Sequence, residues 1–212
     1  MGLAVATHVF ADALNDDQEY ADELAEQLRA INELLAAEGL PPHEEPAARG
    51  AETARGRLGG VPYSFIHYLR RAYAHAREHP DAPLTPVAAG ENPTDDPVVD
   101  RLTYLFDSHL LCHSDCEGYY LPIDFDEVLY PDEALGIPGG MVGSSAQLLR
   151  ELVSVAAHLG ITLIDGELSD AEIAAIHEGD DEHPFYRERE TWLVLFEEAR
   201  VSMANNTLIT FC

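Results

Sequence analysis

Apolar residues recur at helical spacing in one long stretch of the chain, from about Asp16 to Glu38. Asn15 and Gln18 stand three residues apart, which is the spacing of a capping box at a helix N-terminus. Gly39 predicts the point where the helix ends. An amphipathic helix turns its apolar stripe toward a core, and this stripe consists of Leu24, Leu28, Ile31, Leu34 and Leu35.

Along the rest of the chain, shorter stretches with helical spacing alternate with short runs of β-branched and aromatic residues that are typical of strands. We therefore predict an α/β or α+β fold, rich in helix, in which a small sheet of short strands is covered by about five helices. It should form a single compact domain over residues 1–212, with mobile loops near 41–60 and 80–97, where proline, glycine and charge replace any period. The further helices are predicted at 63–78, 98–106, 144–158, 169–177 and 184–203. Strands are predicted at 109–113, 119–123, 161–164 (buried) and 207–211, and residues 3–10 are either a strand or the apolar lead-in to the first helix.

Acidic residues dominate the charged positions, because 39 aspartates and glutamates face 12 basic residues, all of them arginine, for a net charge of -27. Such a polyanion should repel nucleic acid and acidic membranes and attract basic proteins. We expect a basic protein partner, no nucleic acid and no membrane. Codon usage in a high-GC genome or adaptation to salt would also explain the missing lysines. Mimicry of a nucleic-acid backbone is a further reading, although the acids are scattered through every segment.

The chain has no apolar run of the roughly 18 residues that a membrane span requires, and its first ten residues carry no positive charge of the signal-peptide kind. Three cysteines, an odd number, suit a reducing compartment. We therefore expect a cytoplasmic protein.

The densest group of reactive side chains lies between residues 109 and 117. His109, Cys112, His113 and Cys116 are ligand types for zinc or iron, although a strand would send them to opposite sides. Cys116 with His113 and Asp115 is the alternative, a candidate catalytic set with a thiol nucleophile. Buried thiols beside a polar turn are the structural explanation of the same residues.

Two further groups are candidate binding residues. Gly143, Ser144 and Ser145 precede a predicted helix, whose free N–H groups could hold an anion or simply be capped by serine. Arginines gather near the second helix, where planar guanidinium groups could bind a carboxylate or phosphate, or form internal ion pairs. The candidates there are Arg70, Arg71 and the aromatic Tyr63.

Three sequence features together resemble a known family. They are the run His113-Ser-Asp-Cys-Glu-Gly-Tyr-Tyr-Leu-Pro-Ile-Asp-Phe125, the Ile137-Pro-Gly-Gly turn followed by Gly143-Ser-Ser145, and the last helix with Trp192. They are similar to an uncharacterised family of acidic bacterial proteins, chiefly from high-GC actinobacteria. The resemblance implies codon usage as the cause of the missing lysines, and it implies no activity and no catalytic residues.

The leading hypothesis is a non-enzymatic acidic protein that docks a basic protein partner, as toxin-neutralising immunity proteins do. The alternative is a metal-dependent or thiol-based, hydrolase-like enzyme that uses His109, His113, Asp115 and Cys116. No cofactor is expected for the first hypothesis, and zinc is the metal that the second favours. A salt-tolerant housekeeping fold is the third.

Overall fold

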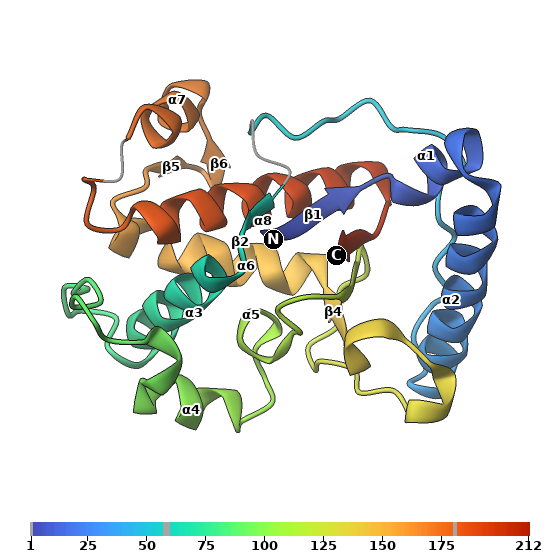
Figure 1. Ribbon diagram of the computed structural model, residues 1–212, viewed down its shortest axis with the longest axis horizontal. Helices are drawn as coiled ribbons and strands as arrows, with labels where there is room; N and C mark the ends of the chain where they lie inside the picture. The colour runs from blue at the N-terminus through green and yellow to red at the C-terminus, as the bar shows by residue number, and fades with distance from the viewer. Residues whose placement is uncertain (1, 57–59, 180–181) are drawn as a thin grey trace.

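A small mixed sheet lies at the centre of the molecule, with helices on both of its faces (Figure 1). The computed structural model describes residues 2–56, 60–179 and 182–212. The strand order is β2-β1-β7-β3-β4, with β3 and β4 parallel and the other neighbours antiparallel. These strands are β1 (Gly2–Thr7), β2 (Gly60–Pro62), β3 (Gly118–Leu121), β4 (Val142–Ser144) and β7 (Ile209–Phe211).

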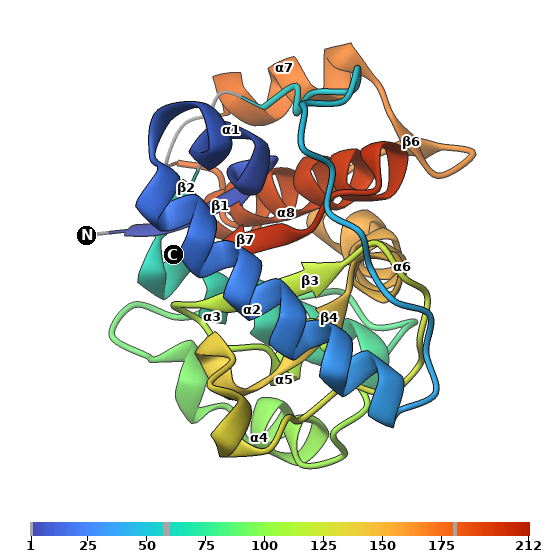
Figure 2. The ribbon, with the colours of Figure 1, turned by 90° about the vertical axis from the view of Figure 1, so that its right-hand side faces the viewer.

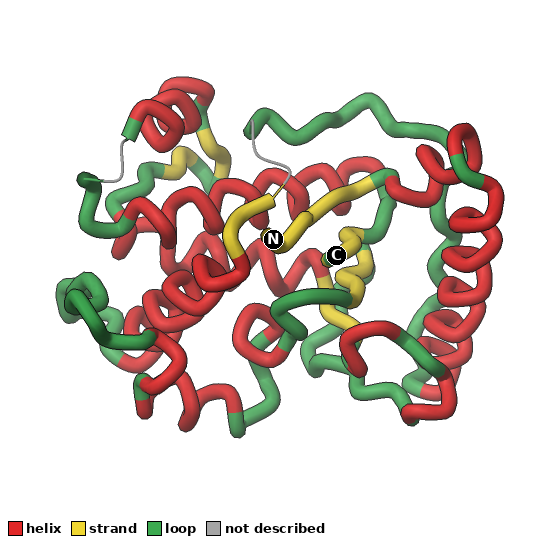
Figure 3. The backbone as a smooth tube through the Cα atoms, viewed as in Figure 1, coloured by secondary structure: helices red, strands yellow, loops and turns green. Residues whose placement is uncertain are grey.

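Helices make up about half of the chain, and the strands are short (Figure 3). Eight α-helices lie within the described residues: α1 (Val9–Asp16), α2 (Gln18–Ala37), α3 (Tyr63–Glu78), α4 (Pro97–Thr103), α5 (His109–Cys112), α6 (Ser145–Ala156), α7 (Asp170–Glu178) and α8 (Tyr186–Asn205). Short 3-10 turns occupy Pro93–Asp95, Glu133–Leu135, Pro138–Gly140 and Ala157–Leu159, and β5 (Leu163–Ile164) pairs with β6 (Glu167–Leu168) in a separate hairpin.

The first hydrophobic core lies between one face of the sheet and helices α3, α6 and α8. Trp192 of α8 is fully buried there, stacks on Phe196 at 4.5 Å between ring centroids, and donates a 2.7 Å hydrogen bond to the carbonyl of Leu152. Because a buried indole N–H needs an acceptor, this bond fixes α8 against α6.

The second core lies on the opposite face, beneath α1, α2 and the loop before β4. Alternation along β3 divides the two cores, because Tyr119 and Leu121 point into the second core while Tyr120 points into the first. Figure 2 shows α2 crossing the face of the molecule in front of β3 and β4. One side of α2 is therefore buried along its length, and the other side faces solvent.

The predicted fold class is confirmed, and the helix predicted at 63–78 begins and ends as expected in α3. The predicted capping box is wrong. Asn15 lies inside α1, and Asp17 caps α2 by accepting a 3.2 Å hydrogen bond from the backbone N–H of Tyr20. Of the buried strand predicted at 161–164, only Leu163 and Ile164 form a strand, in a hairpin where Ile164 is 65% exposed, while Ile161 before it is buried.

The first predicted mobile loop, at 41–60, is hydrogen-bonded to the sheet over its described part. Glu45 accepts a 2.9 Å hydrogen bond from the backbone N–H of Leu208. Mobility in this loop and in 80–97 stays a prediction, and residues 57–59 lie outside the described residues. No helix in the described ranges combines the length and the apolar character that crossing a bilayer demands.

Gly143 of β4 generates a stability prediction. A Cβ atom at this position would lie 2.4 Å from the ring of Tyr120, which is itself fully buried. We expect Gly143→Ala to lower the free energy of unfolding by roughly 1–3 kcal/mol, because the core must shift to admit the methyl group. Urea denaturation measures the change. Gly56→Ala is the control, since its Cβ would meet only Leu193 at 3.8 Å; equal effects of the two substitutions would contradict the packing argument.

Candidate functional site

Exposed carboxylates gather on the solvent side of α2 and at its two ends, and we call this set the acidic face. Between residues 16 and 38 there are eight acids and one arginine, Arg29. All eight acids are exposed, while the opposite side of the helix is buried in the second core. The acidic face consists of Asp16, Asp17, Glu19, Asp22, Glu23, Glu26, Glu33 and Glu38.

Arginines compensate the negative charge elsewhere on the protein. No salt bridge joins any carboxylate of the acidic face to an arginine of the described chain. The acidic face thus keeps a large negative charge, offset only by the exposed Arg29. The arginine salt bridges of the described residues all lie elsewhere: Arg49–Asp12, Arg55–Asp170, Arg55–Glu197, Arg71–Asp96, Arg77–Asp107, Arg101–Glu78, Arg150–Asp124, Arg189–Glu172, Arg200–Glu52 and Arg200–Glu197.

In the first half of α2 the spacing of these charges is close to that of a nucleic-acid strand, whereas beyond Glu26 only Glu33 and Glu38 follow. Five acids fall between Asp17 and Glu26, and at a rise of about 1.5 Å per residue they occupy roughly 14 Å, or about 3 Å for each charge. Phosphates on one strand of B-DNA recur about every 3.4 Å along its axis. The acidic face thus presents a row of anionic oxygens at a comparable linear density.

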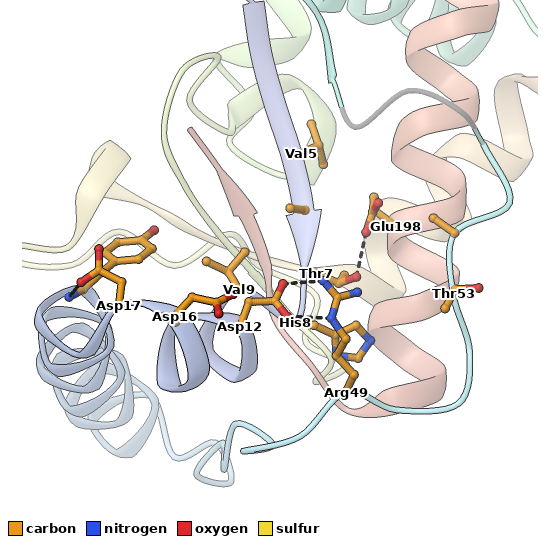
Figure 4. A pocket seen from close by; sticks show the side chains of 14 residues that line it. Val5, Thr7, His8, Val9, Asp12, Asp16, Asp17, Arg49, Thr53 and Glu198 are labelled. Carbon is orange, nitrogen blue, oxygen red and sulfur yellow. Dashed lines mark hydrogen bonds and ion pairs between the residues drawn. The ribbon is translucent and has the colours of Figure 1, made fainter.

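A cleft of about 510 Å³ opens at the end of the acidic face, where β1 meets α1. Figure 4 shows Thr7, His8 and Asp12 on one side of this cleft, with Thr53 and Glu198 on the other. Asp16, Asp17 and Tyr20 also line it, so the cleft and the acidic face are continuous.

His109 lies in a helical turn rather than in the predicted strand, so the strand prediction for 109–113 is wrong. Glu151 of α6 accepts the backbone N–H groups of His109 and Leu110 at 3.0 and 2.7 Å, and Ser108 accepts that of Leu111. A carboxylate from a distant helix thus caps this turn, and nothing in the local sequence reveals it.

Both imidazoles of the predicted ligand group are committed to the backbone. Nδ1 of His109 accepts from the N–H of Ser144 at 2.9 Å, which leaves Nε2 to donate to the carbonyl of Asp126. The nitrogens of His113 face the carbonyls of Ser114 and Tyr119 at 2.9 and 3.2 Å, and burial lowers the pKa of His113 to about 4. The neutral His113 ring has one N–H and donates to one of these carbonyls, while its other nitrogen is enclosed in the core, because the residue is only 2% exposed. Both rings are thus packed against the backbone rather than presented to a metal ion or a thiol.

The remaining members of that group lie apart. Cys112 is buried, with Sγ 3.6 Å from the carbonyl of Thr103, and Cys116 is exposed beside Ser114. Asp115 pairs with His67 at 3.2 Å. Within the ranges that the structure describes, no three histidine, cysteine or acidic side chains are grouped so that they could hold a metal ion.

The two candidate arginines lie next to each other in α3 and are both bound within the protein, Arg70 in the core and Arg71 in an ion pair. Arg70 is buried, and its guanidinium donates to the carbonyls of Leu110 and His113, which holds α5 against α3. Arg71 donates to Asp96 at 3.0 Å. Tyr63 begins α3 and packs against the first core.

The glycine and serine candidates are internal. Ser144 caps α6 through the N–H of Gln147 and donates to the carbonyl of Ile123 at 2.7 Å, while the hydroxyls of Ser145 and Ser202 lie 2.7 Å apart. Gly143 lies against Tyr120, as described above. These residues are fully buried, so the structure places them in the core rather than in a surface turn.

A family model described as "Putative DNA-mimic protein" matches residues 1–211. The chain belongs to this DNA-mimic family. The search of curated proteins and the search of solved structures found no significant match. Membership agrees with the expected resemblance to a family of acidic proteins, whereas the actinobacterial origin and the sequence motifs quoted for it stay predictions.

Membership in the DNA-mimic family corrects one expectation about partners. The prediction of a basic partner with no nucleic acid involved is wrong in its second part, because the family's description ties these proteins to DNA by imitation. A polyanion does repel DNA, but a basic protein surface that attracts DNA would attract such a polyanion as well. The acids are spread along the whole sequence, but five of those in α2 recur at helical spacing, a signal that the sequence does contain: Glu19, Asp22, Glu23, Glu26 and Glu33.

Glu151 generates a prediction about pH. Burial raises the pKa of its carboxyl from 4.5 to about 7. The folded protein therefore holds a proton that the unfolded chain releases, so this contribution to stability is complete below about pH 4.5 and is lost as the pH rises through about 7. The loss is roughly 3 kcal/mol at most.

We expect urea unfolding to show lower stability at pH 8 than at pH 5.5, with a smaller difference in Glu151→Gln, which cannot titrate. Replacing the exposed Glu167 by Gln should leave the difference unchanged. The same pH dependence in Glu151→Gln as in the native protein would contradict the assignment to this residue.

Proposed function

We propose that this protein binds a basic, DNA-binding protein through the acidic face of α2 and thereby competes with DNA. The observation that carries the proposal is the row of eight exposed carboxylates that no arginine of the described chain pairs. Family membership supports the same conclusion independently of the geometry.

Electrostatics would govern this association. Lysines and arginines that contact phosphates on DNA would meet carboxylates at similar spacing, and the net charge of -27 would speed the encounter. Salt screens exposed charges over about 8 Å at physiological ionic strength, so affinity should fall steeply as salt is added. A toxin that acts on DNA would be one such basic, DNA-binding partner. The toxin-neutralising, immunity-type role is therefore a special case of the proposal.

The test is displacement of proteins from immobilised DNA. Basic proteins from the host are bound to a duplex-DNA column at low salt and eluted with the purified acidic protein. We expect native protein to elute them, and the triple variant Asp22→Asn, Glu23→Gln, Glu26→Gln to need about tenfold more protein, since three exposed charges are worth roughly 0.5 kcal/mol each.

A matched variant separates the acidic face from total charge. Asp81→Asn, Asp100→Asn, Glu167→Gln removes three exposed carboxylates that lie outside α2 and form no salt bridge in the described chain. This control should elute as well as native protein does. Equal weakening of both variants would show that net charge alone acts, and failure of native protein to elute anything would contradict the proposed function.

A further inference from the structure

The cleft between β1, α1 and α8 is acidic, and its wall already binds a guanidinium group. Arg49 donates from Nε and Nη2 to the two carboxylate oxygens of Asp12, at 2.6 and 2.5 Å. Two parallel hydrogen bonds of this kind are the way in which a carboxylate recognises arginine. Both side chains remain partly exposed, so the pair sits at the mouth of the cleft rather than in the core.

Glu198 is a buried carboxylate that lines the opposite wall. It is 8% exposed and accepts a 2.8 Å hydrogen bond from Thr7, yet it forms no salt bridge with an arginine of the described chain. Burial raises the pKa of its carboxyl, although Arg49 and Arg200 lie near enough to interact with it electrostatically. A guanidinium group placed in the cleft would supply the direct ion pair that neither of these arginines makes with Glu198.

His8 provides an independent sign of a ligand. The amide of Asn205 is oriented by Glu52, because its Nδ2 donates to the Glu52 carbonyl at 2.7 Å and its Oδ1 accepts the Glu52 N–H. Nδ2 therefore also donates to Nε2 of His8, at 3.0 Å, and the proton of the neutral imidazole lies on Nδ1. That nitrogen is buried and has no acceptor in the described chain, although His8 lines the cleft and is 3% exposed.

A ligand for these groups needs a cation and a hydrogen-bond acceptor close together. The cation would pair with the carboxylates, and an acceptor such as a carbonyl oxygen would take the hydrogen bond from the N–H of His8. An arginine residue within a protein chain offers both, and its planar fork suits paired carboxylate oxygens better than the point charge of lysine does.

We propose that the cleft receives an arginine residue of the basic partner. Its guanidinium pairs with the carboxylates of the cleft, Glu198 foremost, and its main-chain carbonyl accepts from His8. The inference rests on the proposed function for the origin of that arginine, because Asp16 and Asp17 belong to both the cleft and the acidic face. The acidic face would thus attract the partner, and the cleft would select one side chain of it.

The test uses a small probe, N-acetyl-arginine amide, titrated into the full-length protein and followed by amide NMR signals. We expect saturable shifts at Thr7, His8 and Glu198. N-acetyl-citrulline amide, which has the same shape without the charge, should cause none. Equal shifts with both probes, or shifts confined to the outer turns of α2, would overturn the proposal.

Two substitutions sharpen this test. Glu198→Gln should weaken probe binding at least tenfold, and the surface change Asp16→Asn should weaken it a few-fold. Glu188→Gln is the matched control, because Glu188 is buried in the same helix but lies outside the cleft lining. Probe binding that neither Glu198→Gln nor Asp16→Asn alters would place the arginine elsewhere and overturn the assignment.

The DNA-column assay keeps this inference separate from the proposed function. If the probe binds the cleft but native protein displaces nothing from DNA, the arginine site stands and the proposed function fails. If native protein and Glu198→Gln displace DNA-bound proteins equally well, competition with DNA stands and the role of the cleft in it is overturned.

Discussion

The placement of twelve arginines among 39 acidic residues is the constraint on which the rest of the structure depends. Ion pairs can neutralise only a minority of the carboxylates, so their positions decide where negative charge persists. Arg55 and Arg200 converge on the buried Glu197, Arg77 joins α3 to the loop at Asp107, and Arg101 joins α4 to α3. Because α2 receives none of these pairs, its solvent side keeps the charge that the rest of the surface partly loses.

The hydrophobic cores make this arrangement stable. Helix α2 rests on a sheet face through its buried residues, so it does not depend on charge pairing to hold its place. The repulsion among its exposed carboxylates is a modest cost, since like charges at helical spacing destabilise by a few tenths of a kcal/mol per pair. A rigid helix with uncompensated acids is a better imitation of a nucleic-acid strand than a flexible acidic tail, because its charges are already held at their spacing.

Periodicity predicted the elements whose signals are local. The apolar stripe of α2 and the boundaries of α3 follow from residues within the helices themselves, and Ser169 caps α7 as its spacing with Glu172 suggests. The turn at His109 could not be predicted, since its cap is Glu151 of a later helix. The acidic face was visible as spacing, whereas the cleft was not. The cleft requires Glu198, nearly two hundred residues from Thr7 in the chain, to reach the end of β1.

The central claim is that this protein and DNA occupy the same surface of a basic partner. The most direct measurement is sedimentation of a three-component mixture of native protein, a short duplex and a purified protein recovered by displacement from DNA. We expect two binary complexes whose proportions follow the ratio of protein to duplex, with no ternary species, because the carboxylates and the phosphates would contact the same basic residues. A stable ternary complex would contradict it.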